Sequence, residues 1–303
     1  MGVAGSRLPP GVTGLHVLPA DHHDGPWDRM VVPAEDKDRL LGQALLVLRH
    51  GRALQTLSGA RHVLLVLAGP PGTGKSTLCQ GLAQVAAKAV ASRGSTTLVE
   101  VDPHAFPSDL LGESQRAVHR LFAETLPEIA ARRPHTIVVI DEVEAFAVRR
   151  STASFETNPV DVHRATDAVL AGLDGLRREW PHVLLLCTTN FLPAVDESFL
   201  SRADAVVLTQ APNPASLARI FRDTLRELAV LWPELAPLGD DGDLHWRLAD
   251  QHLGVDGRRA RKLVLAALGS HPDLAAEPGL LTRETLLSAA LPEPVVAADL
   301  VGP

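Results

Sequence analysis

The sequence predicts an α/β protein in which a doubly wound parallel sheet is followed by a smaller all-helical domain. Three observations support this fold class. Short, uniformly apolar segments alternate with helix-like segments up to about residue 211, and only helix-like segments follow the Pro/Asn-rich stretch 211–214. A glycine-rich phosphate-binding pattern separates one of these apolar segments from the next helix. Uniformly apolar strands are typical of parallel sheets that helices cover on both faces.

The individual elements follow from hydrophobic periodicity and from the helix and strand boundary signals. A kink is expected at Pro127, because proline cannot donate the helical hydrogen bond. Strands are expected over residues 62–68, 96–101, 136–140, 183–187 and 205–208. Helices are expected over residues 35–54, 74–90 and 112–131, from 158 onward, and over 215–228, 244–253, 257–268 and 283–291.

Changes of composition along the chain predict its division into domains. Residues 1–26 are rich in Gly, Pro and His without periodicity, and we interpret them as a flexible N-terminal arm. The large α/β domain is expected over residues 27–211, the helical domain over 212–291 and a C-terminal tail over 292–303. The adjacent His22 and His23 of the arm have no third fixed ligand in the sequence pattern, so we interpret them as solvated.

Composition excludes several classes of function. The 46% hydrophobic and 21% charged residues are typical of a globular protein, and two cysteines are too few for a disulfide framework or a cysteine-based zinc module. No apolar run approaches the ~20 residues that span a bilayer, and no secretory signal is visible, so a cytoplasmic protein without a membrane partner is expected. The net charge of −7, with 7 Phe, 4 Trp and no Tyr, makes nucleic-acid binding unfavourable.

The strongest functional signal is a match to the phosphate-binding pattern G-x-x-x-x-G-K-[ST]. Glycines allow backbone N–H groups to wrap phosphates, and the following helix presents the positive end of its dipole to them. The lysine is expected to reach the β- and γ-phosphates of ATP, and the serine hydroxyl to bind Mg²⁺. The alternative is a glycine-rich turn beside a chance lysine. The residues of this loop are Gly69, Pro70, Pro71, Gly72, Thr73, Gly74, Lys75, Ser76 and Thr77.

Two further signals lie where apolar strands end. Asp141 and Glu142 follow the strand over 136–140; Asp141 is expected to hold the metal and Glu142 to polarise the attacking water. The alternative for this pair is helix capping. Asn190 follows the strand over 183–187. Because ligands of doubly wound sheets bind at the carboxyl ends of strands, we expect Asn190 to orient the water rather than to serve only as a turn residue.

Two arginines are candidates for stabilising the charge that develops during phosphoryl transfer. Arg202 follows the Asn190 loop closely enough to lie at a subunit edge. Arg258 opens a helix of the second domain and is expected to sense the nucleotide. The basic cluster that begins at Arg258 could instead form a nucleic-acid patch, or simply a solvated face.

Together these residues resemble the AAA+ ATPases, and more narrowly the pachytene checkpoint family of AAA+ remodellers, which act on HORMA-domain proteins. The resemblance runs from about Trp27 to Leu291. The segments that carry it are Gly69–Leu78, Leu111–Ser114, Ile140–Glu144, Ala168–Leu170 with Asp174, Thr188–Asn190, Arg202–Asp204, and Gly254–Arg258 followed by Arg261–Leu263.

The resemblance implies an ATPase that forms a homo-hexameric ring and pulls on a HORMA-domain protein, with ATP and Mg²⁺ as cofactors. It implies that Arg202 acts in the neighbouring subunit and that Arg258 couples a helical lid to the nucleotide. Leu110 and Leu111 occupy the positions of a substrate-gripping pore loop, although subunit packing is an alternative for them. The adenine pocket is expected at Val31 or Val32.

The sequence also departs from this family. Eukaryotic members carry an N-terminal docking domain. The family's pore loop carries an aromatic pair, preceded by a lysine where this chain has Asp109. A compact bacterial-type member is therefore expected, of the kind found with HORMA proteins and cyclic-nucleotide synthases in antiphage defence. Two other functions are alternatives: a DNA-associated AAA+ switch of the clamp-loader or initiator kind, and a nucleotide-gated scaffold that scarcely hydrolyses ATP.

Overall fold

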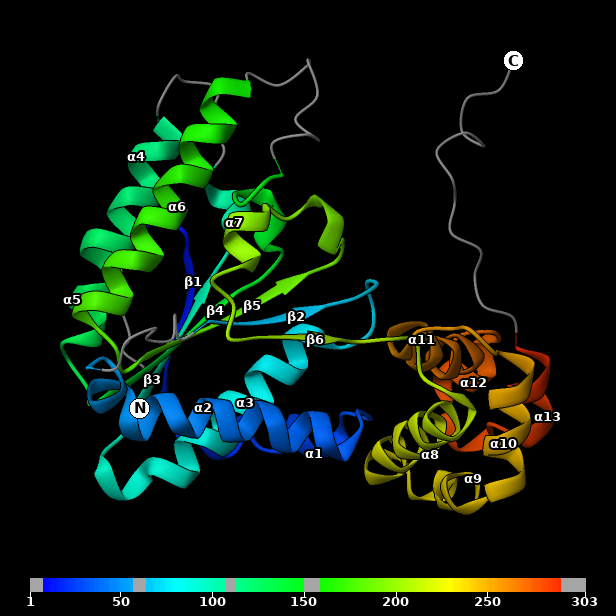
Figure 1. Cartoon of the computed structure of the whole chain (residues 1–303). Coiled ribbons are helices and arrows are strands. Elements are labelled where there is room, and N and C mark those ends of the chain that lie inside the picture. Colours follow the sequence, from blue (N-terminus) through cyan, green and yellow to red (C-terminus); the bar gives the residue numbers. More distant parts are fainter. Residues whose placement is uncertain (1–7, 57–63, 107–112, 150–158, 290–303) are drawn as a thin grey trace, which may run out of the picture. The chain divides into compact units, whose positions relative to one another are not determined.

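The computed structural model describes residues 8–56, 64–106, 113–149 and 159–289 (Figure 1). For residues 159–163 it describes the backbone only. The chain forms two compact units, one of residues 1–70 and 75–209 and one of residues 71–74 and 210–303. The strands are β1 (Val12–Leu18), β2 (Leu64–Ala68), β3 (Thr96–Val101), β4 (His135–Ile140), β5 (Val183–Thr189) and β6 (Ala205–Leu208). The helices of the first unit are α1 (Pro26–Arg29), α2 (Ala34–Leu54), α3 (Lys75–Val90), α4 (Glu113–Arg120), α5 (Leu126–Ala130), α6 (Pro159–Glu179) and α7 (Glu197–Leu200).

Within the described residues, the six strands form one sheet in the order β1-β3-β4-β5-β2-β6. The strands from β2 to β6 pair in parallel, which confirms the predicted doubly wound parallel sheet. Strand β2, which leads into the glycine-rich loop, lies between β5 and β6. This interruption of the chain order is the place where open α/β sheets bind their ligands.

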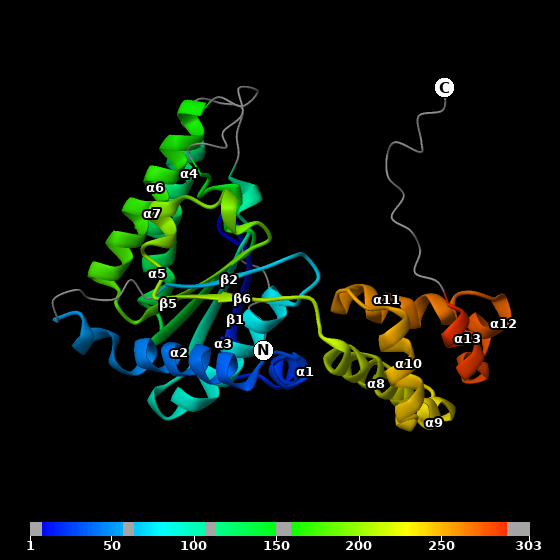
Figure 2. The same cartoon turned by 45° about the vertical axis from the view of Figure 1, so that its right-hand side comes forward.

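The two faces of the sheet form separate apolar cores. On β2, Leu64 and Val66 belong to one apolar cluster, and Leu65 and Leu67 belong to the other, as the alternation of side chains along a strand requires. Helices α4, α5 and α6 cover the first cluster, and α2 and α3 cover the second (Figures 1 and 2). Both clusters consist mainly of Leu, Val, Ile and Ala.

Strand β1 corrects the prediction that residues 1–26 are a flexible arm. It pairs antiparallel with β3 at the edge of the sheet, where Leu18 is opposite Thr96. Its residues alternate between buried and exposed, and Val12 and Leu18 reach the core. The two glycines and three prolines near this segment obscured a pattern that is weak because only one face of the strand is covered.

Helix α2 packs closely against the backbone at the start of β5. A methyl group on the buried Gly51 would overlap the carbonyl oxygen of Pro181, whereas Gly42 of the same helix has open space around it. We therefore expect Gly51→Ala to lower the free energy of unfolding by about 1–3 kcal/mol through overpacking. Gly42→Ala, the matched control, should leave it unchanged or raise it by up to about 1 kcal/mol. Urea denaturation measures both, and equal effects of the two changes would contradict this packing.

The helical segment before β4 is distorted where a kink at Pro127 was predicted. Regular α-helix ends at Arg120, a π-helix covers Leu121–Thr125, and α5 follows. The N–H of Leu126 donates to the carbonyl oxygen of Leu121, which is the i→i−5 bond of a π-turn. Pro127, one residue later, has no N–H and cannot donate the regular i→i−4 hydrogen bond. The wider π-turn lies directly before this interruption of the helical hydrogen bonds.

The described part of the second unit contains helices and no strand. An apolar cluster centred on Leu217 and Phe221 of α8, Leu248 of α10 and Leu263 of α11 forms its core. Of the helices in the described residues of the whole chain, none combines the length and apolarity that crossing a membrane requires. The helices of this unit are α8 (Pro214–Leu231), α9 (Ala236–Asp240), α10 (Gly242–Gln251), α11 (Gly257–Leu268), α12 (Pro272–Ala276) and α13 (Arg283–Ser288).

Candidate active site

The parallel register brings the polar residues at the ends of three strands together. Ala68 of β2 is opposite Thr189 of β5, and Ile140 of β4 is opposite Cys187 of β5. Asp141, the residue after β4, therefore lies beside Thr188. The glycine-rich loop leaves β2 at this same edge and ends where α3 begins.

Lys75 is held at the centre of this edge. Lys75 is buried as a residue, and its ammonium group donates hydrogen bonds to the carbonyl oxygens of Gly69 (2.8 Å) and Pro70 (2.9 Å). A third bond, of 2.8 Å, reaches Oδ1 of Asn190. The loop turns through positive φ at Gly72 (80°) and Gly74 (86°), which only glycine adopts readily. The arrangement offers a phosphate a positive charge at the start of a helix.

Ser76 and Asp141 meet as the residues of a cation site would. The Ser76 hydroxyl donates to both carboxylate oxygens of Asp141, at 2.8 Å and 3.0 Å. The Thr188 hydroxyl donates to Oδ1 of the same carboxylate. Hard oxygen groups of this kind are what Mg²⁺ binds, usually with one or two protein groups and water completing its shell. The donor set therefore fits the divalent cation of a nucleotide complex.

Glu142 is held by contacts on both carboxylate oxygens. Oε1 accepts a hydrogen bond of 2.7 Å from Nδ2 of Asn190, and Oε2 lies 2.9 Å from Nε2 of His104. Its backbone has φ 54° and ψ 54°, a left-handed conformation that costs a non-glycine residue free energy and is concentrated at functional sites. Lys75, Asn190 and Glu142 thus form one hydrogen-bonded chain, which joins three residues predicted separately from the sequence.

Three further residues belong to this network that are not among the site residues predicted from the sequence. Thr188 also accepts a bond of 3.0 Å from the N–H of Glu142. A carboxylate oxygen of Glu144 accepts from the N–H of Asn190 at 2.9 Å, and His104 holds Glu142. Thr188 could have been found from the sequence, because a hydroxyl residue at the carboxyl end of an apolar strand indicates a possible site residue. No local pattern pairs His104 with a glutamate 38 positions later.

We expect Thr188→Val to lower the turnover number for ATP about tenfold. Valine keeps the shape of threonine but removes the bond to Asp141 and leaves the N–H of Glu142 without its partner, and hydrogen bonds to charged groups contribute about 1.5–3 kcal/mol. Steady-state phosphate release measures the change. Thr136→Val is the matched control, because the Thr136 hydroxyl is buried on β4 with no hydrogen-bond partner in the structure as described. Equal turnover of the two variants would remove Thr188 from the network.

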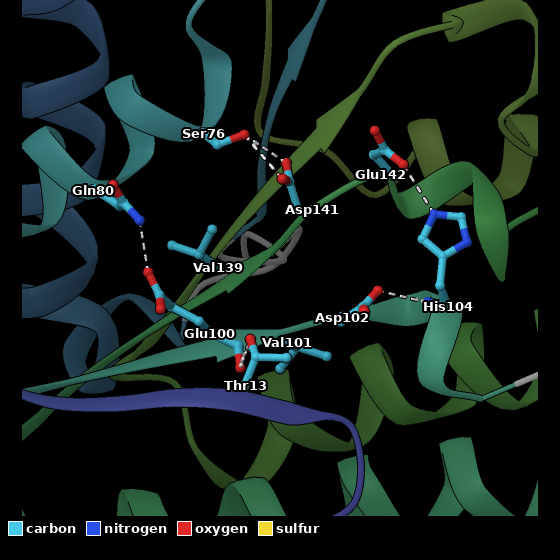
Figure 3. Close-up of a pocket in the computed structure, with 10 residues that line it drawn as sticks. All are labelled: Thr13, Ser76, Gln80, Glu100, Val101, Asp102, His104, Val139, Asp141 and Glu142. Atoms are coloured by element: carbon cyan, nitrogen blue, oxygen red, sulfur yellow. Dashed lines mark hydrogen bonds and ion pairs between the residues drawn. The ribbon is translucent and has the colours of Figure 1, made fainter.

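A cavity of about 440 Å³ adjoins the Ser76–Asp141 pair (Figure 3). Figure 3 shows Ser76 directed at Asp141 and the His104 ring directed at Glu142. Four carboxylates contribute to the wall, so the cavity attracts cations rather than anions. The residues that line it are Thr13, Ser76, Gln80, Glu100, Val101, Asp102, His104, Val139, Asp141 and Glu142.

Arg202 lies two residues after α7 and is paired within its own chain. Its Nε and Nη2 donate to the two carboxylate oxygens of Asp174 on α6, at 3.0 Å and 2.8 Å, and Nη1 donates to the carbonyl oxygen of Ser198 at 2.9 Å. The hydrogen bonds to Asp174 raise the pKa of Arg202, so it remains a cation. The pair holds the guanidinium in a fixed position.

Of the other predicted site residues outside the glycine-rich loop, the described part of the first unit contains only Val31 and Val32, and neither belongs to this network. Arg258 is exposed and belongs to the second unit. Val31 and Val32 are half-buried between α1 and α2, where Val32 packs against the core under α3. Leu110 and Leu111 lie outside the described residues.

Comparison with known proteins agrees with the fold. The family described as "ATPase family associated with various cellular activities (AAA)" matches residues 65–211. CD-NTase-associated protein 6 of Pseudomonas aeruginosa is 40% identical over 284 residues, which are 94% of this chain and 92% of that protein. The pachytene checkpoint protein 2 homolog of Oryza sativa subsp. indica is 36% identical over 215 residues, which are 70% of this chain but only 45% of that longer protein.

Two solved structures share the fold. The structure of C. elegans PCH-2 matches with a TM-score of 0.71 at 24% identity, over 91% of this chain and 76% of that one. A chain of the E. coli MS115-1 HORMA:CdnC:Trip13 complex matches with a TM-score of 0.70 at 20% identity, over 91% of this chain and 93% of that one.

The fold and the site define a P-loop ATPase of the AAA class, an enzyme that binds a nucleotide together with a divalent cation. This confirms the predicted fold class and the general activity. The chain belongs to the family of AAA ATPases that includes CD-NTase-associated protein 6 and the pachytene checkpoint protein 2 homologs, as the sequence resemblance implied.

Proposed function

We propose that this chain hydrolyses ATP with Mg²⁺ in a homo-hexameric ring and uses the reaction to unfold part of a HORMA-domain protein, so that complexes of that protein come apart. The process regulated would be an antiphage, cyclic-nucleotide signalling response in the cytoplasm. The observation that carries the proposal is 40% identity, over 94% of the chain, to a protein named for its association with a CD-NTase. One of the solved structures that share the fold is a complex of HORMA and CdnC with Trip13.

The hydrogen-bonded network supports a division of roles for hydrolysis. The loop amides and Lys75 hold the phosphates, and Ser76 and Asp141 hold the cation. When bound, ATP with Mg²⁺ supplies the transferable phosphoryl group and neutralises charge that develops on it. Glu142 accepts a proton from the attacking water, and Asn190, bonded to both Lys75 and Glu142, fixes where that water lies. Glu142 must release His104 to make its second oxygen available.

Arg202 is proposed to act on the nucleotide of the neighbouring subunit, held in position by Asp174. Arg258 is proposed to couple the helical unit to the nucleotide state, Leu110 and Leu111 to grip the substrate, and Val31 or Val32 to contact the adenine.

Mixed rings test the role of Arg202. Arg202→Ala chains and Lys75→Ala chains should each be inactive alone, yet a mixture should recover part of the turnover, because some interfaces then combine an intact loop with an intact arginine. Phosphate release before and after subunit exchange measures the recovery. Native mass spectrometry verifies that the rings are mixed. If such mixed rings recover no turnover, Arg202 does not act in the neighbouring subunit's site.

Steady-state phosphate release with and without a purified HORMA-domain protein tests the proposed function. We expect the chain to hydrolyse ATP and the HORMA-domain protein to raise its rate. Absence of turnover under all conditions would favour a nucleotide-gated scaffold. Stimulation by duplex DNA in a salt-sensitive manner, without an effect of the HORMA-domain protein, would favour a DNA-associated switch.

A further inference from the structure

The first unit contains a cluster of three histidines that the ATPase chemistry does not use. His16 lies on β1, and His22 and His23 form part of the short 3-10 helix Asp21–His23 that follows it. One ring nitrogen from each lies within 4.8 Å of the others. The ring centroids of His16 and His23 are 4.9 Å apart, and those of His22 and His23 are 4.4 Å apart. None of the three lines the cavity at the Ser76–Asp141 pair.

The spacing of these nitrogens is close to that of metal ligands. Three ligands of a tetrahedral zinc ion, each about 2.0–2.1 Å from the metal, lie about 3.4 Å from one another. His22 is exposed and the side chain of His16 is 35% exposed, so these two rings have room to rotate toward that distance. Because β1 supplies His16, the adjacent His22 and His23 have the third ligand that the sequence pattern lacked.

His23 has a buried ring nitrogen that a ligand could bind. Its Nε2 is buried and has no hydrogen-bond partner among the described residues, and such a buried nitrogen is costly unless something binds it. Burial, and next the charges that His16 and His22 would carry, lower the pKa of His23.

The surroundings of His16 also resemble those of a ligating histidine. Oε2 of Glu100 lies 3.4 Å from Nε2 of His16, and Oε1 of the same carboxylate accepts a hydrogen bond of 2.8 Å from Gln80. A carboxylate fixed beside a histidine is the usual device that orients a metal-binding ring. Gly14 leaves the space for it: a side chain there would come within 2.9 Å of His16 Nε2 and would overlap the Glu100 carboxylate.

We propose that His16, His22 and His23 form a binding site for a divalent transition-metal ion of the Zn²⁺ type, with Glu100 as the residue that orients His16. Three imidazoles and an exposed fourth position suit Zn²⁺, and a tightly hydrated ion such as Mg²⁺ prefers oxygen ligands instead. Bound metal would join the 3-10 helix to β1 and so fasten the edge of the sheet.

Zn²⁺ titration of the full chain in competition with a chromophoric chelator tests the site. We expect one high-affinity Zn²⁺ per chain, retained in the double variant His50→Gln/His271→Gln, which alters two exposed histidines outside the cluster. The triple variant His16→Gln/His22→Gln/His23→Gln should lose it. Circular dichroism without metal checks that the triple variant folds. If it does not fold, the single variant His22→Gln replaces it in the test, because His22 is exposed; we expect it to weaken Zn²⁺ binding at least about tenfold.

Two results would overturn the proposal: no Zn²⁺ bound by the wild-type chain, or the same affinity in the wild type, His22→Gln and the triple variant. Zinc held by Asp141 and its neighbours would give that second result, because those residues are intact in every variant. Co²⁺ gives an independent readout, since absorption bands typical of tetrahedral nitrogen ligation should appear in the wild type and not in the triple variant. Glu100→Gln should weaken Zn²⁺ binding about tenfold or more, and unchanged affinity would remove Glu100 from its positioning role.

Discussion

Glu142→Gln is expected to lower the turnover number for ATP by about 10²- to 10⁴-fold while the chain still binds ATP. The amide has the size of the carboxylate, and its oxygen can still accept the hydrogen bond from Asn190. It cannot take a proton from water, so general-base assistance is lost and the positioned nucleotide is retained. Phosphate release measures turnover, and the fluorescence of a labelled ATP analogue measures binding.

Glu124→Gln is the matched control for this change, because Glu124 is exposed on the π-helix before α5. It should turn over ATP at the wild-type rate. If Glu142→Gln also turns over ATP at the wild-type rate, Glu142 is not the general base. If Glu142→Gln loses ATP binding, the carboxylate is needed to form the site itself.

Lys75→Met is expected to weaken ATP binding about 10- to 150-fold, which corresponds to the loss of a charged hydrogen-bonding group that contributes about 1.5–3 kcal/mol. Methionine keeps the buried apolar stem of Lys75 but removes the ammonium group that reaches phosphates. It also frees Oδ1 of Asn190, which Lys75 holds at 2.8 Å, so turnover at saturating ATP should fall too. Titration with the labelled analogue gives the affinity.

Lys88→Met tests whether any loss of a lysine from α3 has this effect. Lys88 lies near the other end of the same helix, with its side chain 51% exposed and its ammonium group paired with Asp24. Its replacement should leave ATP affinity unchanged. Comparable weakening by both variants would mean that Lys75 acts through the stability of α3 and not through contact with phosphate.

The sequence predicts the parallel core and the main site residues because each has a strong local signal. The strands β2, β4 and β5 are buried throughout and each contains an uninterrupted apolar run. Asp141 and Asn190 directly follow two of these strands, and Lys75 follows the loop after the third. Once strands are known to be parallel, their carboxyl ends must share one edge, so the meeting of these residues follows from the fold class.

What the sequence could not predict depends on pairings between distant segments. The parallel pairing of β4 with β5 is what sets Thr188 beside Asp141, and no local pattern encodes that pairing. The same holds for His104, which reaches Glu142 only because β3 and β4 are neighbours. Strand β1 was missed because its pairing with β3, rather than its own composition, makes it a strand.

If the proposed function holds, hydrolysis at the Lys75–Asn190–Glu142 network drives the dismantling of a HORMA-domain complex. The most direct test is the loss of fluorescence anisotropy as a labelled peptide leaves its complex with a HORMA-domain protein. The wild-type chain should release the peptide with ATP, and neither a non-hydrolysable analogue nor Glu142→Gln should support release. Two results would contradict this function. One is release of the peptide at the same rate without hydrolysis, and the other is ATP hydrolysis that the complex stimulates but that releases no peptide.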